Sequence, residues 1–256
     1  MQTGKGPPKK LSGCQVSKSG CASLVSALSS GGSCLKELDL SYNCTGGSEA
    51  QQLTALFNHP QKKLNLEHGG EERLQKDFRK YACFLTFDQN TANKMIKFSN
   101  NERTISLEKE KQSYPDHSER FDYWKQVLCA EGLRGRSYWE VETRGDVYIA
   151  VTYKSIRRRG TGDESCLGKN EQSWSLGCTE DTCSVLHKNR RRSLKRSAHR
   201  VGVYLDWEGG VLSFYDVSSD QKIHLQTFKT RFTEEVYPAF RIKTKPSDSS
   251  VTLCPV

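Results

Sequence analysis

The segment 200–215 constrains the fold of this 256-residue chain more than any other. Its sequence, RVGVYLDWEGGVLSFY, contains two runs in which apolar residues alternate with others, joined by a Glu-Gly-Gly turn. A period of two places the apolar side chains of each run on one face, and a short glycine-containing turn lets two strands pair antiparallel. We therefore predict an antiparallel hairpin with one face in a hydrophobic core.

Other short segments show the same alternation and are separated by turn residues. In YWEVE, for example, Trp139 and Val141 alternate with Glu140 and Glu142. We expect Trp139 and Trp174 to be core residues. Evenly spaced short strands favour a mainly β protein with a sandwich of antiparallel sheets. The expected strands are 138–143, 147–153, 173–178, 183–187, 201–207 and 211–216.

The first third of the chain has a different pattern, typical of leucine-rich repeats. The spacing Leu-x-x-Leu-x-Leu-x-x-Asn occurs once in full, at Leu35, Leu38, Leu40 and Asn43. Partial echoes at Leu11 and Leu64 give a repeat of about 26 to 29 residues, which suits repeats that contain a helix. We expect Asn43 or Cys14 to hydrogen-bond or pack inside a strand-to-loop turn.

Two amphipathic helices are expected between these strands, at 20–29 and 48–58. Their inward-facing residues would be Leu24, Val25, Leu28, Leu53, Leu56 and Phe57. The predicted organisation is thus an unstructured N-terminus (1–10), about two and a half leucine-rich repeats (11–68), a charged linker (69–80) and a β domain (81–256). Because a stable stack needs at least about three repeats, we expect the chain to be part of a longer receptor or a partial gene product.

Composition places the chain among soluble, cytoplasmic proteins. Its net charge is +9 and 35% of its residues are hydrophobic, with a mean hydropathy of −0.71. No apolar run approaches the roughly 20 residues that span a bilayer, and no apolar segment follows the N-terminus, so we expect neither membrane insertion nor secretion. The ten cysteines include no Cys-x-x-Cys pair, which argues against zinc and for reduced thiols.

Three sequence blocks resemble the PRY-SPRY domain family in order and spacing. They are LTFDQNTAN at 85–93, which reads as a strand ending in a polar turn, YWEVE at 138–142 and LDWEGGVLSFY at 205–215. The resemblance covers about residues 80 to 256 and departs at Gln89, where the family usually has proline, which loosens the turn. It implies an antiparallel β-sandwich that recognises a protein ligand through loops at one end.

Leucine-rich repeats followed directly by PRY-SPRY resemble the C-terminal part of fish NACHT and leucine-rich-repeat (NLR-type) receptors. This resemblance implies the ligand-sensing part of a cytosolic innate-immune receptor. The sequence contains no Gly-x-x-x-x-Gly-Lys-Ser/Thr loop for nucleotide phosphates. Tripartite-motif ubiquitin ligases and fish venom toxins end in the same kind of domain, but this sequence shows neither a zinc region nor a membrane-inserting segment.

The candidate protein-binding residues combine aromatic side chains with arginine, because interface anchors are enriched in these types. They are Tyr123, Trp124, Arg157, Arg158, Arg159 and Trp207. Trp207 would be half-exposed at a turn. The alternative for the arginines is a solvated loop whose charge is offset by Asp163 and Glu164.

A second basic stretch suggests an alternative function, electrostatic binding of RNA or an anionic surface together with the arginines at 157–159. Its candidate residues are Lys188, Arg190, Arg191, Arg192, Lys195 and Arg196. The stretch lacks interleaved aromatic residues for base stacking, which disfavours nucleic acid. A plain solvated hairpin loop is the other interpretation.

Catalysis has little support in the sequence. Glu140 and Glu142 share one face of a strand, about 6.5 to 7 Å apart along it, which is a separation that inverting glycosidases use. That mechanism needs carboxylates on opposite sides of a sugar, which one strand cannot provide. The six histidines show no metal spacing, and there is no Gly-x-Ser-x-Gly motif. We predict no catalytic residue, cofactor, metal or small-molecule substrate, although a Cys-His pair formed only by the fold stays open.

Overall fold

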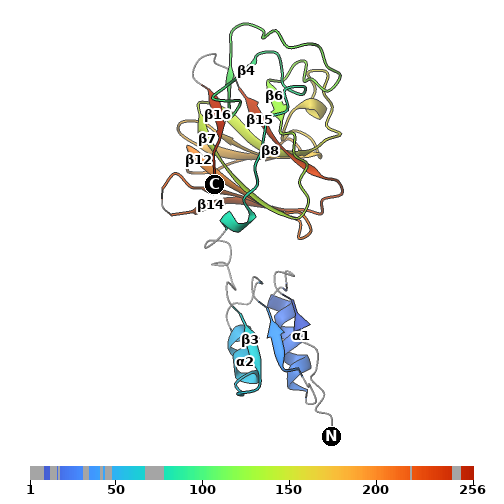
Figure 1. The fold of residues 1–256 in the computed structure, drawn as a ribbon, viewed down its shortest axis with the longest axis vertical. Helices are drawn as coiled ribbons and strands as arrows, with labels where there is room; N and C mark the ends of the chain where they lie inside the picture. Colours follow the sequence, from blue (N-terminus) through green and yellow to red (C-terminus); the bar gives the residue numbers. More distant parts are fainter. Residues whose placement is uncertain are drawn as a thin grey trace. The chain divides into compact units, whose positions relative to one another are not determined.

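The chain divides into two compact units, Met1–Phe78 and Arg79–Val256. The structure is a computed structural model, drawn in Figure 1, that describes residues 9–11, 16, 18–30, 35–40, 43, 48–66, 78–219, 221–243 and 249–256. The division falls within the segment 69–80 that the sequence assigns to a linker. Of that segment, residues 69–77 lie outside the described part.

The second unit contains two β-sheets in which all neighbouring strands pair antiparallel. A six-stranded sheet has the order β11-β10-β9-β8-β15-β6 and a seven-stranded sheet has the order β14-β13-β12-β7-β16-β5-β4. The six-stranded sheet consists of β6 (Gln126–Leu128), β8 (Val147–Tyr153), β9 (Ser173–Cys178), β10 (Cys183–His187), β11 (Arg190–Ser193) and β15 (Val236–Ile242). The seven-stranded sheet consists of β4 (Ile96–Ser99), β5 (Thr104–Leu107), β7 (Arg136–Arg144), β12 (Arg200–Asp206), β13 (Val211–Asp216), β14 (Ile223–Lys229) and β16 (Ser250–Leu253).

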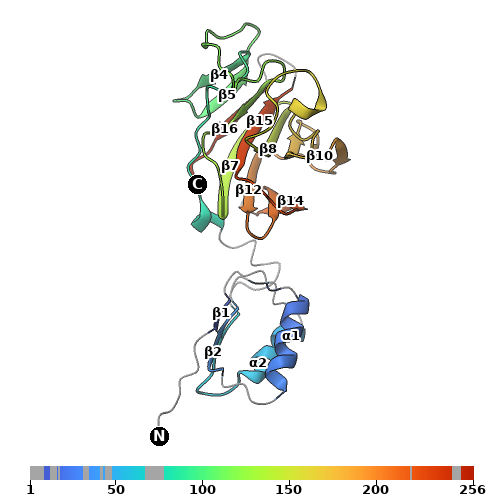
Figure 2. The same ribbon diagram turned by 90° about the vertical axis from the view of Figure 1, so that its right-hand side faces the viewer.

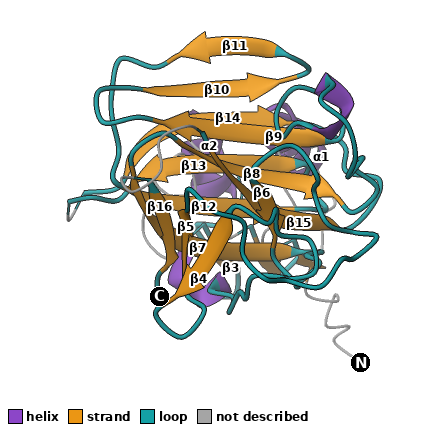
Figure 3. Cartoon of the chain, turned by 90° about the horizontal axis from the view of Figure 1, so that it is seen from above, coloured by secondary structure: helices purple, strands orange, loops and turns teal. Residues whose placement is uncertain are grey.

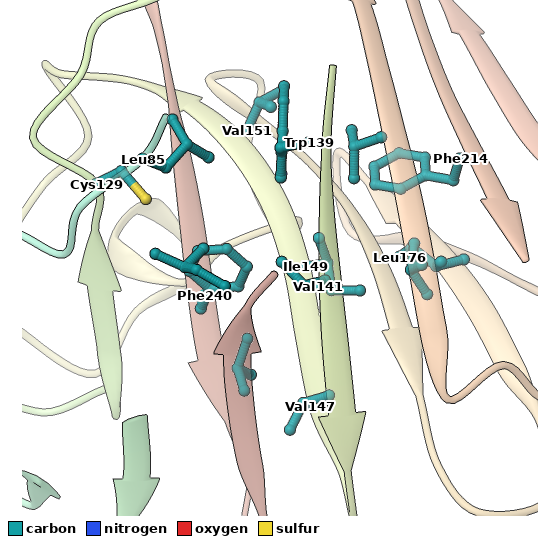
Figure 4. Packing of buried hydrophobic residues seen from close by; sticks show 14 of the residues in the cluster. Leu85, Cys129, Trp139, Val141, Val147, Ile149, Val151, Leu176, Phe214 and Phe240 are labelled. Atoms are coloured by element: carbon teal, nitrogen blue, oxygen red, sulfur yellow. The ribbon is translucent and has the colours of Figure 1, made fainter. Parts of the chain in front are cut away.

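A single large hydrophobic cluster lies between the two sheets (Figure 4). Trp139 from β7 and Trp174 from β9 are 2% and 3% exposed, which confirms both as core residues. Val141, Ile149 and Phe240 are completely buried beside them. Burial of each such aliphatic or aromatic side chain stabilises the fold by about 1.5 to 3 kcal/mol. The sandwich is therefore held together mainly by the inner faces of its strands.

The hairpin predicted at 200–215 is present as β12 and β13. Val203 pairs with Phe214 and Leu205 with Leu212 across the two strands. The turn between them needs glycine at Gly210, because its φ is +63° and an added Cβ would lie 1.9 Å from the Thr230 carbonyl oxygen. Local alternation and turn chemistry thus determine this element.

The predicted strands agree closely with the structure. β8, β9, β10 and β13 begin and end at the predicted residues, β7 is longer, and β12 is shifted by one residue. The strand expected in LTFDQNTAN is wrong, because this segment forms only an isolated bridge between Phe87 and Cys129 before Asp88 begins a turn. β11 was expected to be a loop. All four residues of its Arg-Arg-Arg-Ser sequence are exposed at the edge of the sheet. The strand therefore has no buried face, and its sequence lacks the alternation of apolar and polar residues that would have predicted it.

The first unit contains a three-stranded parallel sheet and two helices. In chain order these are β1 (Lys9–Lys10), α1 (Lys18–Ser29), β2 (Glu37–Asp39), α2 (Ser48–Leu56) and β3 (Lys63–Asn65). Figure 2 shows both helices on one side of β1 and β2. The segment 1–10 was expected to be unstructured, but its last two residues form β1, and residues 1–8 lie outside the described part.

The core of the first unit confirms the predicted inward-facing residues. Leu38, Leu40, Leu53 and Phe57 are buried. Residues packed against them include Leu11, Leu24, Val25, Leu28, Leu56 and Leu64. Within the described residues, neither helix has the length and apolar character needed to cross a bilayer.

Asn43 is fully buried and ties two chain segments together. Its Oδ1 accepts the backbone N–H of Val16 at 2.9 Å, and its Nδ2 donates to the carbonyls of Leu11 (2.6 Å) and Leu40 (3.1 Å). Asn43 thereby supplies hydrogen-bond partners to backbone groups of Leu11, Val16 and Leu40 that do not pair within the sheet through these bonds. The predicted role of Asn43 is confirmed, whereas Cys14 lies outside the described residues.

Candidate functional site

The structure brings two predicted groups of residues together, the segment around Trp124 and the loop that follows β8. The backbone N–H of Asp122 donates to the carbonyl of Arg158 at 3.2 Å. The Asp122 carboxylate accepts the backbone N–H of Gly160 at 3.0 Å, and the Trp124 indole Nε1 donates to the Gly162 carbonyl at 3.3 Å. These three contacts fix the segment and the loop relative to one another.

The loop after β8 has a defined shape. Gly160 has a φ of +99°, a conformation that favours glycine. The hydroxyl of Ser165 donates to the carbonyls of Gly160 (2.9 Å) and Gly162 (3.0 Å). Ile156 in this loop is buried in a second, smaller apolar cluster that also contains Phe121. The loop is therefore held in one conformation by these hydrogen bonds and by the packing of Ile156.

The two aromatic candidates at this site differ in exposure. Tyr123 is 48% exposed and packs edge-to-face on Trp124, with ring centroids 5.2 Å apart. Trp124 is half-buried, and the cationic groups of Lys169 (5.4 Å) and Arg241 (5.6 Å) lie over its ring. Trp124 therefore anchors the segment, while Tyr123 presents its ring to solvent.

The three arginines of the loop have different environments. Arg157 is exposed and lies 3.6 Å from a carboxylate oxygen of Glu164, as the solvated-loop interpretation expects. Arg158 folds back, donating to the carbonyls of Ile156 and Lys154 while its guanidinium lies over the Phe121 ring. Burial lowers its pKa. Only Arg159 is both exposed and part of the hollow described next.

A hollow of about 680 Å³ lies between the strand-free segments that precede β6 and the loop after β8. Its lining includes the basic side chains of Lys94, Lys111, Arg120, Lys125 and Arg159, the carboxylates of Asp116 and Asp122, and the rings of His117 and Tyr123. Lys94 Nζ is 2.5 Å from the Asp116 carboxylate and lowers the pKa of that group. Because five lysine and arginine side chains line the hollow against two aspartates, its net charge is positive.

Arg120 builds one wall of this hollow and is only 7% exposed. Its NH1 donates to the carbonyls of Gln89 (2.7 Å) and Ala92 (2.6 Å), and its NH2 donates to the carbonyl of Pro115 (2.8 Å). Arg120 contacts Gln89 only through its backbone carbonyl in this bond, a group that proline also has. Glutamine in place of the proline that the family usually has at this position therefore keeps the contact. Arg120 therefore holds three backbone segments of the wall together.

Trp207 does not belong to this hollow. It lies in the turn between β12 and β13, half-buried, with its Nε1 donating to the Glu234 carbonyl at 2.7 Å. The guanidinium of Arg134 lies over its ring at 5.4 Å. The half-exposure predicted for Trp207 is confirmed, but the structure places it apart from Tyr123 and Arg159.

The second basic stretch runs along the edge of the six-stranded sheet. Its residues are Lys188, Arg190, Arg191, Arg192, Lys195 and Arg196, and all are exposed. Lys188 pairs with Glu171 at 3.0 Å and Arg196 with Asp216 at 3.7 Å. The interpretation as a solvated hairpin is confirmed by this exposure, but residues 190–193 form an edge strand where a loop was expected.

The carboxylate of Glu140 connects strands of the seven-stranded sheet. Glu140 is 5% exposed, accepts the Tyr138 hydroxyl at 2.7 Å and accepts the Arg200 Nε at 2.8 Å. Glu142 on the same face is exposed. Both carboxylate oxygens of Glu140 are therefore engaged in hydrogen bonds within the sheet.

In the described part of the chain, no three metal-ligating side chains come together.

Family models place this site in a known domain. The model for the PRY, or SPRY-associated, domain matches residues 85–133, and the model for the SPRY domain matches residues 136–255. Residues 85–255 belong to the PRY-SPRY family. The hollow contains residues from both parts of the PRY-SPRY domain, because Lys94 and Tyr123 lie in the first and Arg159 lies in the second.

Similar proteins include toxin subunits and tripartite-motif proteins. Stonustoxin subunit alpha from Synanceia horrida is 45% identical over 173 residues, which are 66% of this chain and 25% of the toxin. Mouse tripartite motif-containing protein 16 is 35% identical over 179 residues, which are 68% of this chain and 32% of that protein. This chain thus spans about a quarter to a third of the length of these relatives.

Solved structures show the same sandwich. The stonustoxin structure superposes with a TM-score of 0.63 at 37% identity and covers 69% of this chain and 28% of that chain. The crystal structure of the TRIM65 PSpry domain has a TM-score of 0.63 at 27% identity and covers 70% of this chain and 93% of that chain. The PRY-SPRY resemblance and the antiparallel sandwich are therefore confirmed. SPRY domains generally bind protein partners, and this domain is consistent with a protein-interaction module.

Several lining residues of the hollow were missed by the sequence analysis. Lys94, Asp116, Arg120 and Asp122 lie in irregular segments that meet only in the folded domain. The one available signal was the cluster of polar and charged residues around Tyr123, because such loops on a rigid sandwich commonly carry binding residues.

Proposed function

We propose that this chain is a non-enzymatic recognition module that binds a protein ligand through the hollow beside Tyr123 and Arg159. The observation that carries this proposal is that two exposed side chains, Tyr123 and Arg159, line the same hollow, which has a volume of about 680 Å³. Tyrosine and arginine are enriched among residues that dominate binding energy. The fold class of the domain supports the same kind of function.

The rigidity of the site supports recognition by a preformed surface. Asp122 and Trp124 hold the loop after β8, and Arg120 ties the segment that precedes Tyr123 to the backbone of Ala92. A loop that is already ordered loses less conformational entropy when it binds. Affinity would then come from a small aromatic and arginine centre, surrounded by the charged rim of the hollow.

The first unit supports a proposal about the larger protein. We propose that it consists of leucine-rich repeats, because parallel strands alternate with helices and Asn43 bonds to the backbone of the preceding repeat. Repeats followed by a PRY-SPRY domain support the ligand-sensing C-terminal part of an NLR-like receptor in innate immunity. The seven described cysteines are free thiols, which supports a cytoplasmic location.

A second candidate function is electrostatic binding of an acidic polymer. The exposed basic residues at Arg157, Arg159 and along β11 favour it. Raising the salt concentration separates the two candidates, because binding dominated by phosphate contacts weakens steeply with salt. A protein interface built on a few packed anchors is much less sensitive.

Site-directed photocrosslinking tests the main proposal. Benzoylphenylalanine would replace Tyr123 in the full chain, with Ser219, an exposed turn residue, replaced in a matched control. We expect Tyr123→benzoylphenylalanine to crosslink a discrete protein from cytosolic extract, both after nuclease treatment and at about 1 M salt. Arg159→Ala should abolish that band. Equal crosslinking from position 219, or a band removed by nuclease or salt, would contradict the proposal.

A further inference from the structure

Strand β11 is an edge strand with one side open. In the six-stranded sheet it pairs only with β10, and the described part of the chain places no strand beyond it. Figure 3 shows β11 as the outermost strand on its side of the domain. An exposed strand edge is a template for pairing with another chain.

The hydrogen-bonding phase of β11 shows which backbone groups are open. The Leu194 N–H donates to the Cys183 carbonyl at 2.8 Å, so Leu194 faces β10. Backbone groups of successive residues in an antiparallel pair point alternately toward and away from the partner strand. Arg190 and Arg192 therefore bond toward β10. The N–H and carbonyl groups of Arg191 and Ser193 point away from the sheet.

The hairpin that carries β11 is held in place. Lys188 and Asn189 form its two-residue turn with φ values of 52° and 57°. The Lys188 N–H donates to the Asn170 carbonyl at 3.1 Å, and Asn189 Nδ2 donates to the Asp163 carboxylate at 2.8 Å. The open edge is thus presented by a preorganised element.

The open edge carries a concentrated positive charge. Among described residues, Lys188 and Arg196 have carboxylate partners, whereas no ion pair involves Arg190, Arg191 or Arg192. Arg191 Nε donates to the Ser184 hydroxyl at 3.0 Å, and Arg192 contacts the Gln226 side chain. The carboxylates nearest the turn, those of Asp163 and Glu171, are paired with Lys169 and Lys188. Three successive arginines therefore line the strand without matching acids.

We propose that β11 is a docking edge for an extended acidic segment of a protein partner, which pairs with it as an added strand. The open backbone groups of Arg191 and Ser193 would supply main-chain hydrogen bonds, and acidic side chains opposite the arginines would set the specificity. A second copy of this chain does not fit, because arginine would then face arginine. Nucleic acid fits less well, because β11 and its flanking turns offer no aromatic ring for base stacking.

The test measures binding of a fluorescent peptide of alternating glutamate and threonine to the full chain by anisotropy. A second peptide has the same sequence and charge, but its central backbone amides are N-methylated and cannot donate hydrogen bonds. Ser193→Pro removes one outward N–H without changing charge, at a position where an edge strand tolerates proline. Ser193→Ala is its matched control.

We expect the N-methylated peptide to bind at least about tenfold more weakly than the unmodified one. Ser193→Pro should weaken binding of the unmodified peptide by a similar factor, and Ser193→Ala should leave it unchanged. Should Ser193→Pro fail to fold, the two peptides still decide the outcome on the unaltered chain. Equal binding of both peptides would show a purely electrostatic patch and overturn the proposal. No binding, or tighter binding of a single-stranded RNA of equal charge, would also overturn it.

Discussion

Asp122 fastens the loop after β8 through Gly160, whose backbone N–H donates to the Asp122 carboxylate at 3.0 Å. The same glycine has a φ of +99°, so the loop turns at the point where it is held. This contact joins the segment that presents Tyr123 to the loop that presents Arg159. The Asp122 carboxylate therefore contributes to the spacing of the two candidate anchors, together with the contacts of the Asp122 backbone and of Trp124.

Asp122→Ala should loosen the loop without unfolding the domain. A hydrogen bond to a charged group contributes about 1.5 to 3 kcal/mol, and partial exposure of Asp122 reduces this figure. We expect amide hydrogen exchange at residues 157–162 to accelerate by about tenfold, while exchange in β8 stays unchanged. Asp181→Ala, which changes an exposed acid elsewhere, is the control. Unchanged exchange in the loop would show that its packing alone holds it.

Glu140→Ala should destabilise the domain strongly, because it leaves the Tyr138 hydroxyl and the Arg200 guanidinium without their shared acceptor. Removal of one partner of a buried ion pair costs about 3 to 5 kcal/mol, and the partial exposure of Arg200 places the expected loss near the lower value. The measurement is the free energy of unfolding in urea. Glu142→Ala, on the exposed neighbour, should cost less than about 1 kcal/mol. Similar losses for both variants would contradict the assigned role of Glu140.

Cys83 should react slowly with alkylating reagents at neutral pH. Burial raises the pKa of its thiol from 9.0 to about 11. The thiolate is the reactive form, so a raised pKa lowers the reactive fraction at every pH below it. We expect the iodoacetamide rate at Cys83 to increase until about pH 11, and at pH 8 to lie about a hundredfold below that of the same peptide in the urea-unfolded chain. Mass spectrometry of that peptide measures both rates, and a plateau near pH 9 would be the contrary result.

Phe240→Ala should cost about 3 to 5 kcal/mol of unfolding free energy, since Phe240 is fully buried in the cluster between the sheets. Phe84→Ala makes the same chemical change at a side chain that is 72% exposed. We expect it to cost less than about 1 kcal/mol. Chemical unfolding of the two variants compares a core position with a surface position of equal size.

The sequence predicts those elements whose side chains alternate between core and solvent. β8, β9, β10 and β13 are found at their predicted limits because their apolar residues meet one core. β11 has no such pattern, since its fold depends on backbone pairing with β10 rather than on burial of its own side chains. Edge strands of this kind are hidden from hydrophobic patterning.

The site was predictable only in part. Tyr123 and Arg159 could be chosen from residue type and loop position, and both line the hollow. Arg158 carries the same charge but turns back onto Phe121, which depends on a contact between segments far apart in sequence. The separation of Trp207 from the hollow likewise follows from the arrangement of strands and not from its local sequence.

The most direct test of recognition through the hollow is the affinity of the captured protein partner for Tyr123→Ala and Trp207→Ala variants, measured by titration calorimetry on the full chain. Tyr123 lies in the hollow and Trp207 lies outside it. We predict that Tyr123→Ala weakens binding by about thirtyfold, the effect of losing a binding hot spot, and that Trp207→Ala changes it by less than about threefold. Loss of affinity with Trp207→Ala and none with Tyr123→Ala would contradict the assignment of the hollow.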